Sequence, residues 1–212
     1  MRRYIGSMEL QNDSYLVLNS RATAEIKVKG SRFIAIAVPV SSVEEAEVEL
    51  TAIKKRDYDA THHCSAFKIG RSGTVFRYSD DGEPNSSAGL PIFRQIDSRL
   101  LTDTLVVVVR YYGGTKLGTG GLVRAYGEAA GAALDQATIA EIIPRTLVAL
   151  EYAYDDTSPS MHAIGQFDVI IKETTYSEQT CMILAVRSAQ ILEFEQAIIE
   201  ALSGRGVFSI VD

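Results

Sequence analysis

The sequence predicts an α+β protein with two domains. The chain has 212 residues, which is long for one domain of ordinary size and sufficient for two. Residues 105–109, Leu-Val-Val-Val-Val, form an apolar run typical of a central strand buried on both faces. After Pro144 the segments read strand, helix, strand, strand, helix, strand, which is the ferredoxin-like order. We therefore expect domains at 1–143 and 144–212.

The elements of the first domain follow from periodicity and turn signals. Three extended segments, YLVL, AEIKVKG and RFIAIAVPV, occupy residues 14–40. Ser41 or Ser42, followed by Glu44 and Glu45, predicts the start of a helix that ends near Arg56. Further on we expect strands at 62–69 and 74–78, joined by a turn at 70–73, and helices at 91–101 and 121–138.

In the second domain, the apolar periodicity and turn signals separate the expected strands and helices more clearly. Their expected ranges are strand 146–154, helix 158–166, strands 167–174 and 181–187, helix 189–202 and strand 207–211.

Composition and targeting signals predict a soluble cytoplasmic protein with no membrane partner. Hydrophobic residues make up 46% and charged residues 23%, which excludes wholesale disorder. The N-terminus lacks the apolar core of a signal peptide, and no apolar run approaches the roughly 20 residues that span a bilayer. Cys64 and Cys181 fall in different predicted domains, so we expect two reduced, buried thiols.

The acidic charge is concentrated in the second domain. The net charge is −6; residues 1–144 hold 17 basic and 17 acidic residues, whereas 145–212 hold 4 and 10. Residues 104–127 contain no carboxylate but carry Arg110, Lys116 and Arg124. Local fields rather than net charge steer ligands, so this window favours an anionic partner.

The segment 110–127 (RYYGGTKLGTGGLVRAYG) is the strongest candidate site. A buried strand ends here, glycines follow and a helix begins, so free backbone N–H groups meet the positive end of a helix dipole. Aromatic rings interleaved with cations suit phosphate or RNA contact. The candidate ligand- or nucleic-acid-binding residues are Arg110, Tyr112, Gly113, Gly114, Lys116, Gly118, Gly120, Gly121, Arg124 and Tyr126.

Known nucleotide motifs do not fit this segment. Lys116 lies between Thr115 and Leu117, unlike a P-loop lysine, and Val123 stands where the dinucleotide fingerprint needs glycine. A purely structural alternative is that the glycines serve only a sharp turn and close helix packing.

Two other segments are weaker candidates. His62 and Cys64 would share one face of a strand and could be metal ligands or a Cys–His nucleophile. No third ligand at recognisable spacing supports zinc, and nothing nearby is assured of lowering the thiol pKa, so a packed or surface role is the default. Asp80, Asp81 and Glu83 could hold a cation or act as acid and base, although the loop around them is foremost a turn signal. We predict no bound metal and no cofactor.

Four segments together resemble the YigZ/IMPACT family: DATHHC (59–64), YSDDGEP (78–84), AGLP (88–91) and VVVVRYYGGTKLGTGGLVRAYGEAA (106–130). The resemblance runs from about Thr23 to the C-terminus. Asn85, Ser86 and Ser87 replace the Ser-Gly-Thr that the family pattern has after Gly-Glu-Pro.

The resemblance implies a fold for each domain and a link to translation. The first domain would have a βαβ fold similar to the second domain of the small-subunit ribosomal protein S-five type, and the second would be similar to the last domain of elongation factor G. Eukaryotic relatives modulate a translational-control kinase by competing for its activator.

Three functions remain open at this point. The leading one is a translation-associated binding protein that contacts RNA, the ribosome or a regulatory protein through the glycine-rich segment, without DNA specificity. The second is an enzyme acting on a small anionic or phosphorylated substrate, although no catalytic residue is identified and we lean against an enzyme. The third is a pure protein-interaction module, favoured by the acidic second domain.

Overall fold

The chain divides into two compact units, each with its own sheet and helices. The computed structural model describes residues 3–5, 8–10 and 13–211. The division falls between Ile142 and Ile143, and Asp13 and Ser14 group with the C-terminal unit, whereas the sequence analysis expected domains at 1–143 and 144–212. The reason for this grouping is Asp13, whose buried carboxylate accepts hydrogen bonds from Arg187 of that unit.

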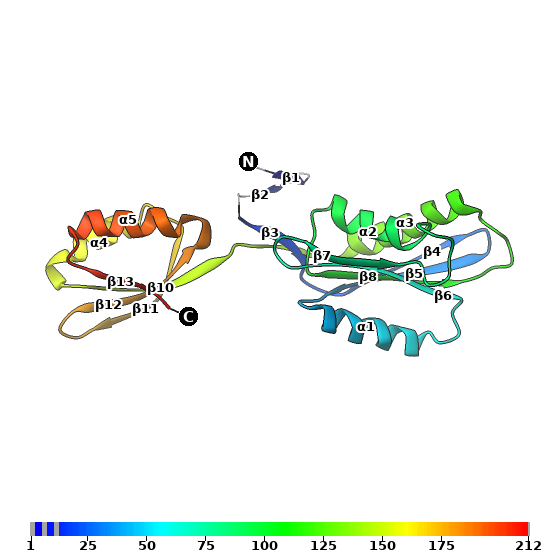
Figure 1. Ribbon diagram of the computed structural model, residues 1–212, viewed down its shortest axis with the longest axis horizontal. Helices are drawn as coiled ribbons and strands as arrows, with labels where there is room; N and C mark the ends of the chain where they lie inside the picture. The colour runs from blue at the N-terminus through cyan, green and yellow to red at the C-terminus, as the bar shows by residue number, and fades with distance from the viewer. Residues whose placement is uncertain (1–2, 6–7, 11–12, 212) are drawn as a thin grey trace. The chain divides into compact units, whose positions relative to one another are not determined.

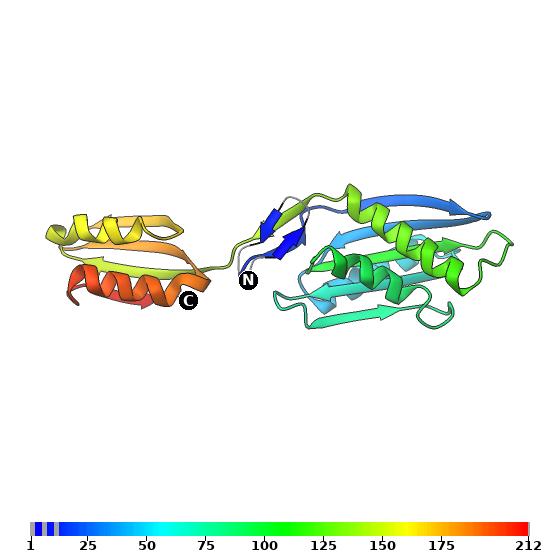
Figure 2. The same ribbon diagram turned by 90° about the horizontal axis from the view of Figure 1, so that it is seen from above.

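The N-terminal unit is a five-stranded antiparallel sheet with helices on both faces (Figure 1). The strand order is β4-β5-β8-β6-β7, and helix α1 lies on one face while α2 and α3 lie on the other (Figures 1 and 2). The elements are β4 (Ala22–Val28), β5 (Ser31–Pro39), α1 (Val43–Arg56), β6 (His62–Ile69), β7 (Val75–Ser79), α2 (Gly89–Ser98), β8 (Thr104–Tyr111) and α3 (Thr119–Gln136).

The apolar run 105–109 forms the middle of the central strand β8, as predicted. Its side chains are at most 1% exposed, because α1 covers one face of the sheet and α2 and α3 the other. Strands β5 and β6 are both antiparallel to β8, so β5, α1 and β6 form a βαβ connection with β8 inserted between its strands.

The predicted helix starts are right for α1 and two residues late for α2 and α3. Ser42 caps α1 by accepting a 3.1 Å hydrogen bond from the Glu45 N–H. Helix α2 starts at Gly89 rather than Pro91 because the Asp80 carboxylate accepts the N–H groups of Ala88 and Gly89. A local reading of the sequence cannot see a cap supplied from eight or nine residues away.

Short strands precede and follow the main sheet. β3 (Tyr15–Leu18) pairs with β9 (Ile139–Ile142), a strand that the sequence analysis did not predict. β1 (Arg3–Ile5) and β2 (Met8–Leu10) form a two-stranded sheet at the N-terminus.

The C-terminal unit has the predicted βαββαβ order. Its four-stranded antiparallel sheet has the order β11-β12-β10-β13, and α4 and α5 pack on one face around Phe194 and Leu184 (Figure 1). The elements are β10 (Arg145–Tyr152), a 3-10 turn η1 (Tyr154–Asp156), α4 (Thr157–Ile164), β11 (Val169–Tyr176), β12 (Thr180–Arg187), a 3-10 turn η2 (Ser188–Gln190), α5 (Ile191–Leu202) and β13 (Val207–Ile210). Among the described helices, none combines the length and hydropathy that crossing a bilayer requires.

Candidate anion-binding site

The glycine-rich segment after β8 leads into an uncapped helix. Gly118 is the N-cap of α3 with φ 71° and ψ 163°, and no side chain caps the helix. The first N–H that returns to the cap is that of Leu122, which donates to the Gly118 carbonyl at 2.9 Å. Thr119 and Gly120 are exposed. The first turn of α3 therefore presents free N–H donors and the positive end of a helix dipole to solvent.

A pocket of about 440 Å³ opens beside this helix start, and we call it the Arg110 pocket. Such a volume lies in the range of small-ligand sites. Residues from four segments line it: Thr61 and His62 at the start of β6, Glu83 and Pro84 from the loop before α2, Arg110 and Tyr112 at the end of β8, and 116–119 with Leu122 at the start of α3.

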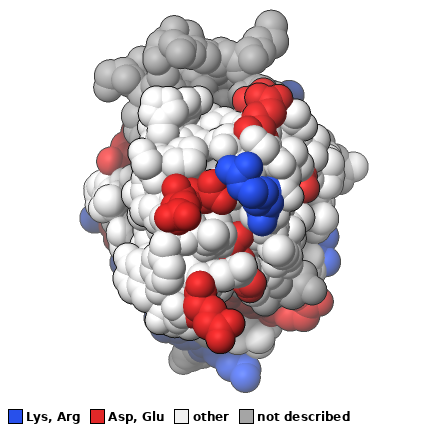
Figure 3. All heavy atoms as spheres, turned by 90° about the vertical axis from the view of Figure 1, so that its left-hand side faces the viewer, with Lys and Arg blue, Asp and Glu red and all other residues white. Residues whose placement is uncertain are grey.

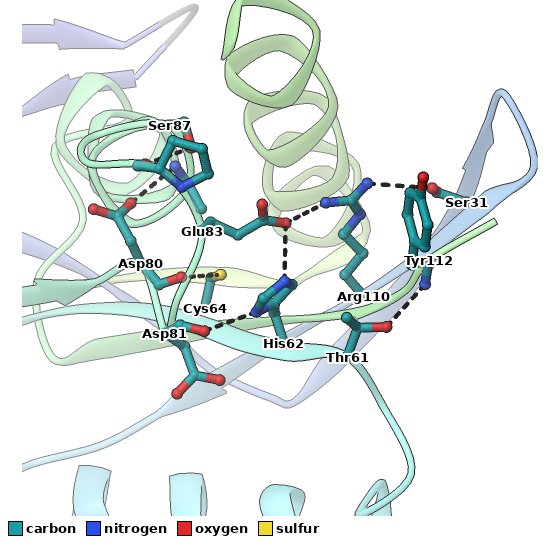
Figure 4. Close-up of polar contacts among 12 residues, drawn as sticks. Ser31, Thr61, His62, Cys64, Asp80, Asp81, Glu83, Ser87, Arg110 and Tyr112 are labelled. Atoms are coloured by element: carbon teal, nitrogen blue, oxygen red, sulfur yellow. Dashed lines mark hydrogen bonds and ion pairs between the residues drawn. The ribbon is translucent and has the colours of Figure 1, made fainter. Parts of the chain in front are cut away.

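A buried ion pair forms the inner wall of the Arg110 pocket (Figure 4). Arg110 Nη1 donates to Glu83 Oε1 at 2.5 Å, and the Tyr126 hydroxyl donates to the same oxygen at 2.7 Å. Arg110 is 5% and Glu83 8% exposed. The sequence suggested Arg110 as an exposed cation, but the structure shows that it is buried and that Glu83 balances its charge.

One nitrogen of the Arg110 guanidinium, Nε, makes no hydrogen bond. Nη2 contacts Ser31 Oγ at 3.4 Å, and the guanidinium carbon lies 5.4 Å from the ring centroids of both Phe33 and Tyr112. Nε is buried and has no hydrogen-bond partner. Within the described residues, the Thr180 hydroxyl is the other buried side-chain group without a hydrogen-bond partner. A buried donor left without a partner costs about 1–3 kcal/mol, so a ligand acceptor that reached it would be favoured.

His62 presents its second ring nitrogen to the Arg110 pocket. Its Nδ1 lies 2.8 Å from the Asp81 carbonyl oxygen, which can only accept, so Nδ1 carries the proton and donates. Nε2 then faces Glu83 Oε1 at 3.9 Å (Figure 4). In the neutral ring this nitrogen is an acceptor, and in the protonated ring it is a second donor beside the carboxylate.

Asp80 and Asp81 fix the loop and are not placed for metal chemistry. Asp80 accepts three backbone N–H groups, from Ser86, Ala88 and Gly89. Asp81 accepts the His63 N–H at 2.7 Å and pairs with Lys54. Burial alone would raise the pKa of Asp81, but these bonds and the Lys54 charge outweigh it and lower the pKa. In the described part of the chain, no three His, Cys, Asp or Glu side chains cluster as a metal site would require.

Cys64 and Tyr126 lie beneath the Arg110 pocket, and burial disfavours the ionised form of both side chains. The Cys64 thiol is fully buried and donates to the Asp80 carbonyl oxygen at 3.0 Å. Burial raises the pKa of Cys64 to about 12, and the nearby charges of Glu83, Asp81 and Asp80 act in the same direction. A hydrogen bond with Tyr126 lowers the pKa but does not outweigh these effects. The Tyr126 ring is also fully buried, and burial raises its pKa strongly. A thiolate nucleophile at Cys64 is therefore disfavoured.

Comparison with known proteins shows to which family the chain belongs. Residues 29–134 match the Impact N-terminal domain, and residues 150–205 match a domain of unknown function, DUF1949. The IMPACT family member YvyE of Bacillus subtilis is 33% identical over 192 residues, covering 91% of this chain and 88% of that protein. The IMPACT family member YigZ of Escherichia coli is 33% identical over 194 residues, covering 91% and 95%. This chain belongs to the IMPACT family.

A solved structure supports the two-domain fold of this IMPACT family member. The crystal structure of a protein described as hypothetical matches with a TM-score of 0.65 and 31% identity, covering 95% of this chain and 99% of the other.

The structure of this IMPACT family member brings some of the predicted site residues together and separates others. Arg110, Tyr112, Lys116 and Gly118 line the Arg110 pocket. Arg124, Gly114 and Gly120 are exposed on the same segment, with Gly121 half-buried beside them. Tyr126 contributes no stacking face because its ring is buried beneath the pocket.

Gly113 has a packing role in the structure. An added Cβ would overlap the backbone of Gly30 and Ser31, because the β4–β5 turn lies directly against this position. The Gly113 N–H also donates to Ser31 Oγ at 3.2 Å. Gly113 therefore holds the β4–β5 turn close to the end of β8.

The sequence analysis missed two residues of the IMPACT-domain site. The sequence suggested His62 only as a metal ligand or as the partner of a Cys64 nucleophile, and it suggested no role for Thr61. Thr61 Oγ1 accepts the Tyr112 N–H at 3.0 Å and so anchors the start of the glycine-rich segment (Figure 4). The available signal was the position of both residues at the start of a strand next to β8, which becomes visible only with the strand pairing.

Proposed function

We propose that this protein is a translation-associated binding protein that contacts RNA through the Arg110 pocket and the exposed part of the glycine-rich segment. The observation that carries the proposal is the uncapped start of α3, which has Lys116 exposed just before it and Arg124 exposed in its first turns. Free helix N–H groups and exposed cations are the usual partners of phosphate. The link to translation comes from the family resemblance.

The exposed ring of Tyr112 adds a second kind of contact. It is 46% exposed and lies at the wall of the same pocket. Bases of single-stranded RNA stack on such rings, and stacking tolerates any sequence because every base has a π-face. The combination of one stacking ring with cations and free N–H groups favours single-stranded RNA over a duplex.

A salt titration tests RNA binding. Affinity for a single-stranded RNA should fall steeply with salt, since each neutralised phosphate releases counterions. Lys116→Ala with Arg124→Ala should weaken binding and reduce the slope of log K against log salt by about 1.4, from roughly 0.7 for each lost contact. Lys55→Ala with Arg71→Ala removes the same charge from exposed positions outside the pocket and should change little.

Sedimentation with ribosomes tests the translation link. The tagged protein should co-sediment with ribosomal particles at low salt, and the Lys116→Ala, Arg124→Ala variant should stay near the top of the gradient. Salt-independent RNA binding, or no binding to RNA or ribosomes at low salt, would contradict the proposal.

An enzyme acting on a small phosphorylated substrate is the second candidate, and the placement of His62 favours it. Its Nε2 faces the pocket beside Glu83, so an acid–base group lies near the anion-receptive helix start. Incubation with phosphorylated metabolites should then give turnover that His62→Gln abolishes. An unchanged metabolite pool would remove this candidate.

A protein-interaction role rests on the C-terminal unit. The sheet face opposite α4 and α5 carries the partly exposed side chains of Leu147, Ile170 and Val207. Figure 3 shows acidic groups spread over the end of this unit, which is a poor surface for RNA. Pulldowns with and without residues 145–212 test this role, because full retention of partners by the truncated chain would argue against it.

A further inference from the structure

We infer that the Arg110 pocket recognises a nucleotide that ends in a phosphate monoester, either a free mononucleotide or the phosphorylated end of an RNA. This inference rests on the proposed function and narrows it from RNA in general to a terminal nucleotide. Two features of the pocket support it: a rim with free N–H donors and a lysine that can bind an anion, and a single exposed ring on which a base can stack.

The rim provides the phosphate position. The uncapped N–H group of Thr119 and the exposed Lys116 side chain lie at one edge of the pocket, and the exposed Gly120 follows in the same first turn. A monoester carries more charge and more free oxygens than a diester within a chain, so it gains more from several converging donors. Glu83 also lines the pocket, but its carboxylate is paired with Arg110, so we expect the phosphate at the α3 edge, where the donors are free.

The inner part of the pocket suits the rest of the nucleotide. Tyr112 offers a partly exposed ring, and Pro84, Leu117 and Leu122 add apolar surface. Figure 4 shows the Tyr112 ring beside the Arg110 guanidinium, on the side away from Glu83.

The size of the site favours one nucleotide over a run of nucleotides. About 440 Å³ accommodates a single small ligand. Tyr112 is the one tyrosine, phenylalanine or tryptophan ring that lines the pocket, so a second base would have no ring of this kind to stack on. A chain continuing in both directions would instead need a groove lined with several rings and cations.

The test compares four probes on the full chain at one salt concentration: a single-stranded RNA of ten nucleotides with hydroxyl ends, the same RNA with a 5′-phosphate, the same RNA with a 3′-phosphate, and a hydroxyl-ended RNA two nucleotides longer. The longer RNA adds two diester charges, about as many as one monoester carries at neutral pH, without adding a monoester. We expect one of the phosphorylated RNAs to bind at least tenfold more tightly than both hydroxyl-ended RNAs.

Competition with AMP and adenosine separates the two sources of the ligand. If AMP displaces the phosphorylated RNA and adenosine does not, the pocket takes free mononucleotides as well as ends. If neither competes but the phosphate preference persists, the ligand is the RNA end, with contacts beyond one nucleotide. Both outcomes support a terminal phosphate monoester.

Thr119→Pro is the sharpest variant, because proline fits the first position of a helix and removes its N–H; Thr119→Ala, which loses the hydroxyl but keeps the N–H, is its matched control and should keep the preference. The proline variant should reduce the preference for the phosphorylated RNA to less than threefold, whereas Lys55→Ala should leave it unchanged. Tyr112→Ala should weaken binding about tenfold and Tyr112→Phe should not, which tests the stacking position independently. Thermal unfolding curves check that each variant is folded.

Equal affinity for hydroxyl-ended and phosphorylated RNAs, with no preference for AMP over adenosine, would overturn this inference. If salt-dependent RNA binding persisted in that case, the proposed function would stand. If none of the probes bound, both would fail. A phosphate preference that Thr119→Pro left intact in a folded variant would place the phosphate elsewhere and overturn the assignment to this pocket.

Discussion

Glu83 and Arg110 form an ion pair of 2.5 Å inside the N-terminal unit, although they are 27 residues apart and lie on a loop and a central strand. This pair joins the loop before α2 to the end of β8, and the Tyr126 hydroxyl binds the same carboxylate oxygen from α3. Three segments of the Arg110 pocket are therefore held by one carboxylate.

The first prediction concerns the stability contributed by this pair. Glu83→Gln should lower the free energy of unfolding by about 3 kcal/mol, because it leaves the Arg110 charge buried without its counterion. The double variant Glu83→Gln, Arg110→Met should recover part of the loss, since it removes the uncompensated charge. Urea unfolding of the wild type and the variants measures both effects. A loss below 1 kcal/mol for the single variant would contradict the prediction.

The second prediction concerns the reactivity of Cys64. With its pKa raised to about 12 and its thiol fully buried, Cys64 should resist alkylation by iodoacetamide at pH 8 in the folded protein. It should react once the protein is unfolded in denaturant. Mass spectrometry of the labelled peptides follows this residue, with the partly exposed Cys181 as the internal comparison. Rapid labelling of folded Cys64 would be inconsistent with the packing beneath the pocket.

The third prediction concerns acid stability through Asp13. Burial alone would raise the pKa of Asp13, but hydrogen bonds from Arg187 and the Ala189 N–H, with the Arg187 charge, lower it below the usual 3.8. A lowered pKa in the folded state means that the stabilisation is complete above about pH 4 and is lost as the pH falls through the folded value.

The stability difference between wild type and Asp13→Asn should therefore be largest near pH 6 and shrink toward pH 3. Denaturant unfolding, followed in the C-terminal unit at several pH values, measures it. Asp97→Asn, an exposed carboxylate of the other unit, is the control for general acid effects. A difference that stays constant from pH 6 to pH 3 would show that the charge of Asp13 is not what stabilises the unit.

The fourth prediction compares two glycines of the same segment. Gly113→Ala should destabilise the protein by 2 kcal/mol or more, because the new methyl group would overlap the Gly30 backbone. Gly120→Ala meets no atom within 4 Å and lies in a helix, so it should be neutral or stabilise by up to about 1 kcal/mol. Thermal unfolding of the two variants tests the contrast, and similar effects at both positions would contradict it.

The fifth prediction concerns the tripeptide at 85–87, where the sequence differs from the family pattern. Ser86 has a φ of 59°, a left-handed conformation that costs a residue with a side chain about 1–2 kcal/mol, and the family pattern has glycine here. Ser86→Gly should therefore stabilise the protein by about 0.5–1 kcal/mol, after the entropy cost of glycine is subtracted. Asn85 is outside this region of φ, so Asn85→Gly should be slightly destabilising. Calorimetry should separate the two variants.

The sequence was sufficient to predict the elements whose signals are local. The apolar run 105–109, the cap at Ser42 and the order of elements after Pro144 each depend on neighbouring residues, and each is present in the structure. The start of α2 was misjudged because its cap, Asp80, comes from a distant loop. β9 was missed because its pairing partner β3 lies more than 120 residues earlier in the chain.

Only part of the candidate site could be predicted from the sequence, because some of its contacts come from distant elements. Lys116, Gly118 and Tyr112 follow one another along the chain, so their pattern is visible in the sequence. The burial of Arg110 depends on Glu83 and Tyr126, which reach it from other elements. A count of local charges therefore included a cation that the fold neutralises.

The position of the Tyr112 ring has a practical consequence for spectroscopy. The chain contains no tryptophan, so Tyr112→Trp would introduce the sole indole fluorophore at the wall of the Arg110 pocket. Excitation at wavelengths beyond tyrosine absorption, where only the indole absorbs, would then report on this site alone. Quenching by added nucleotides, or by acrylamide in their absence, would read out occupancy of the pocket in real time without a label.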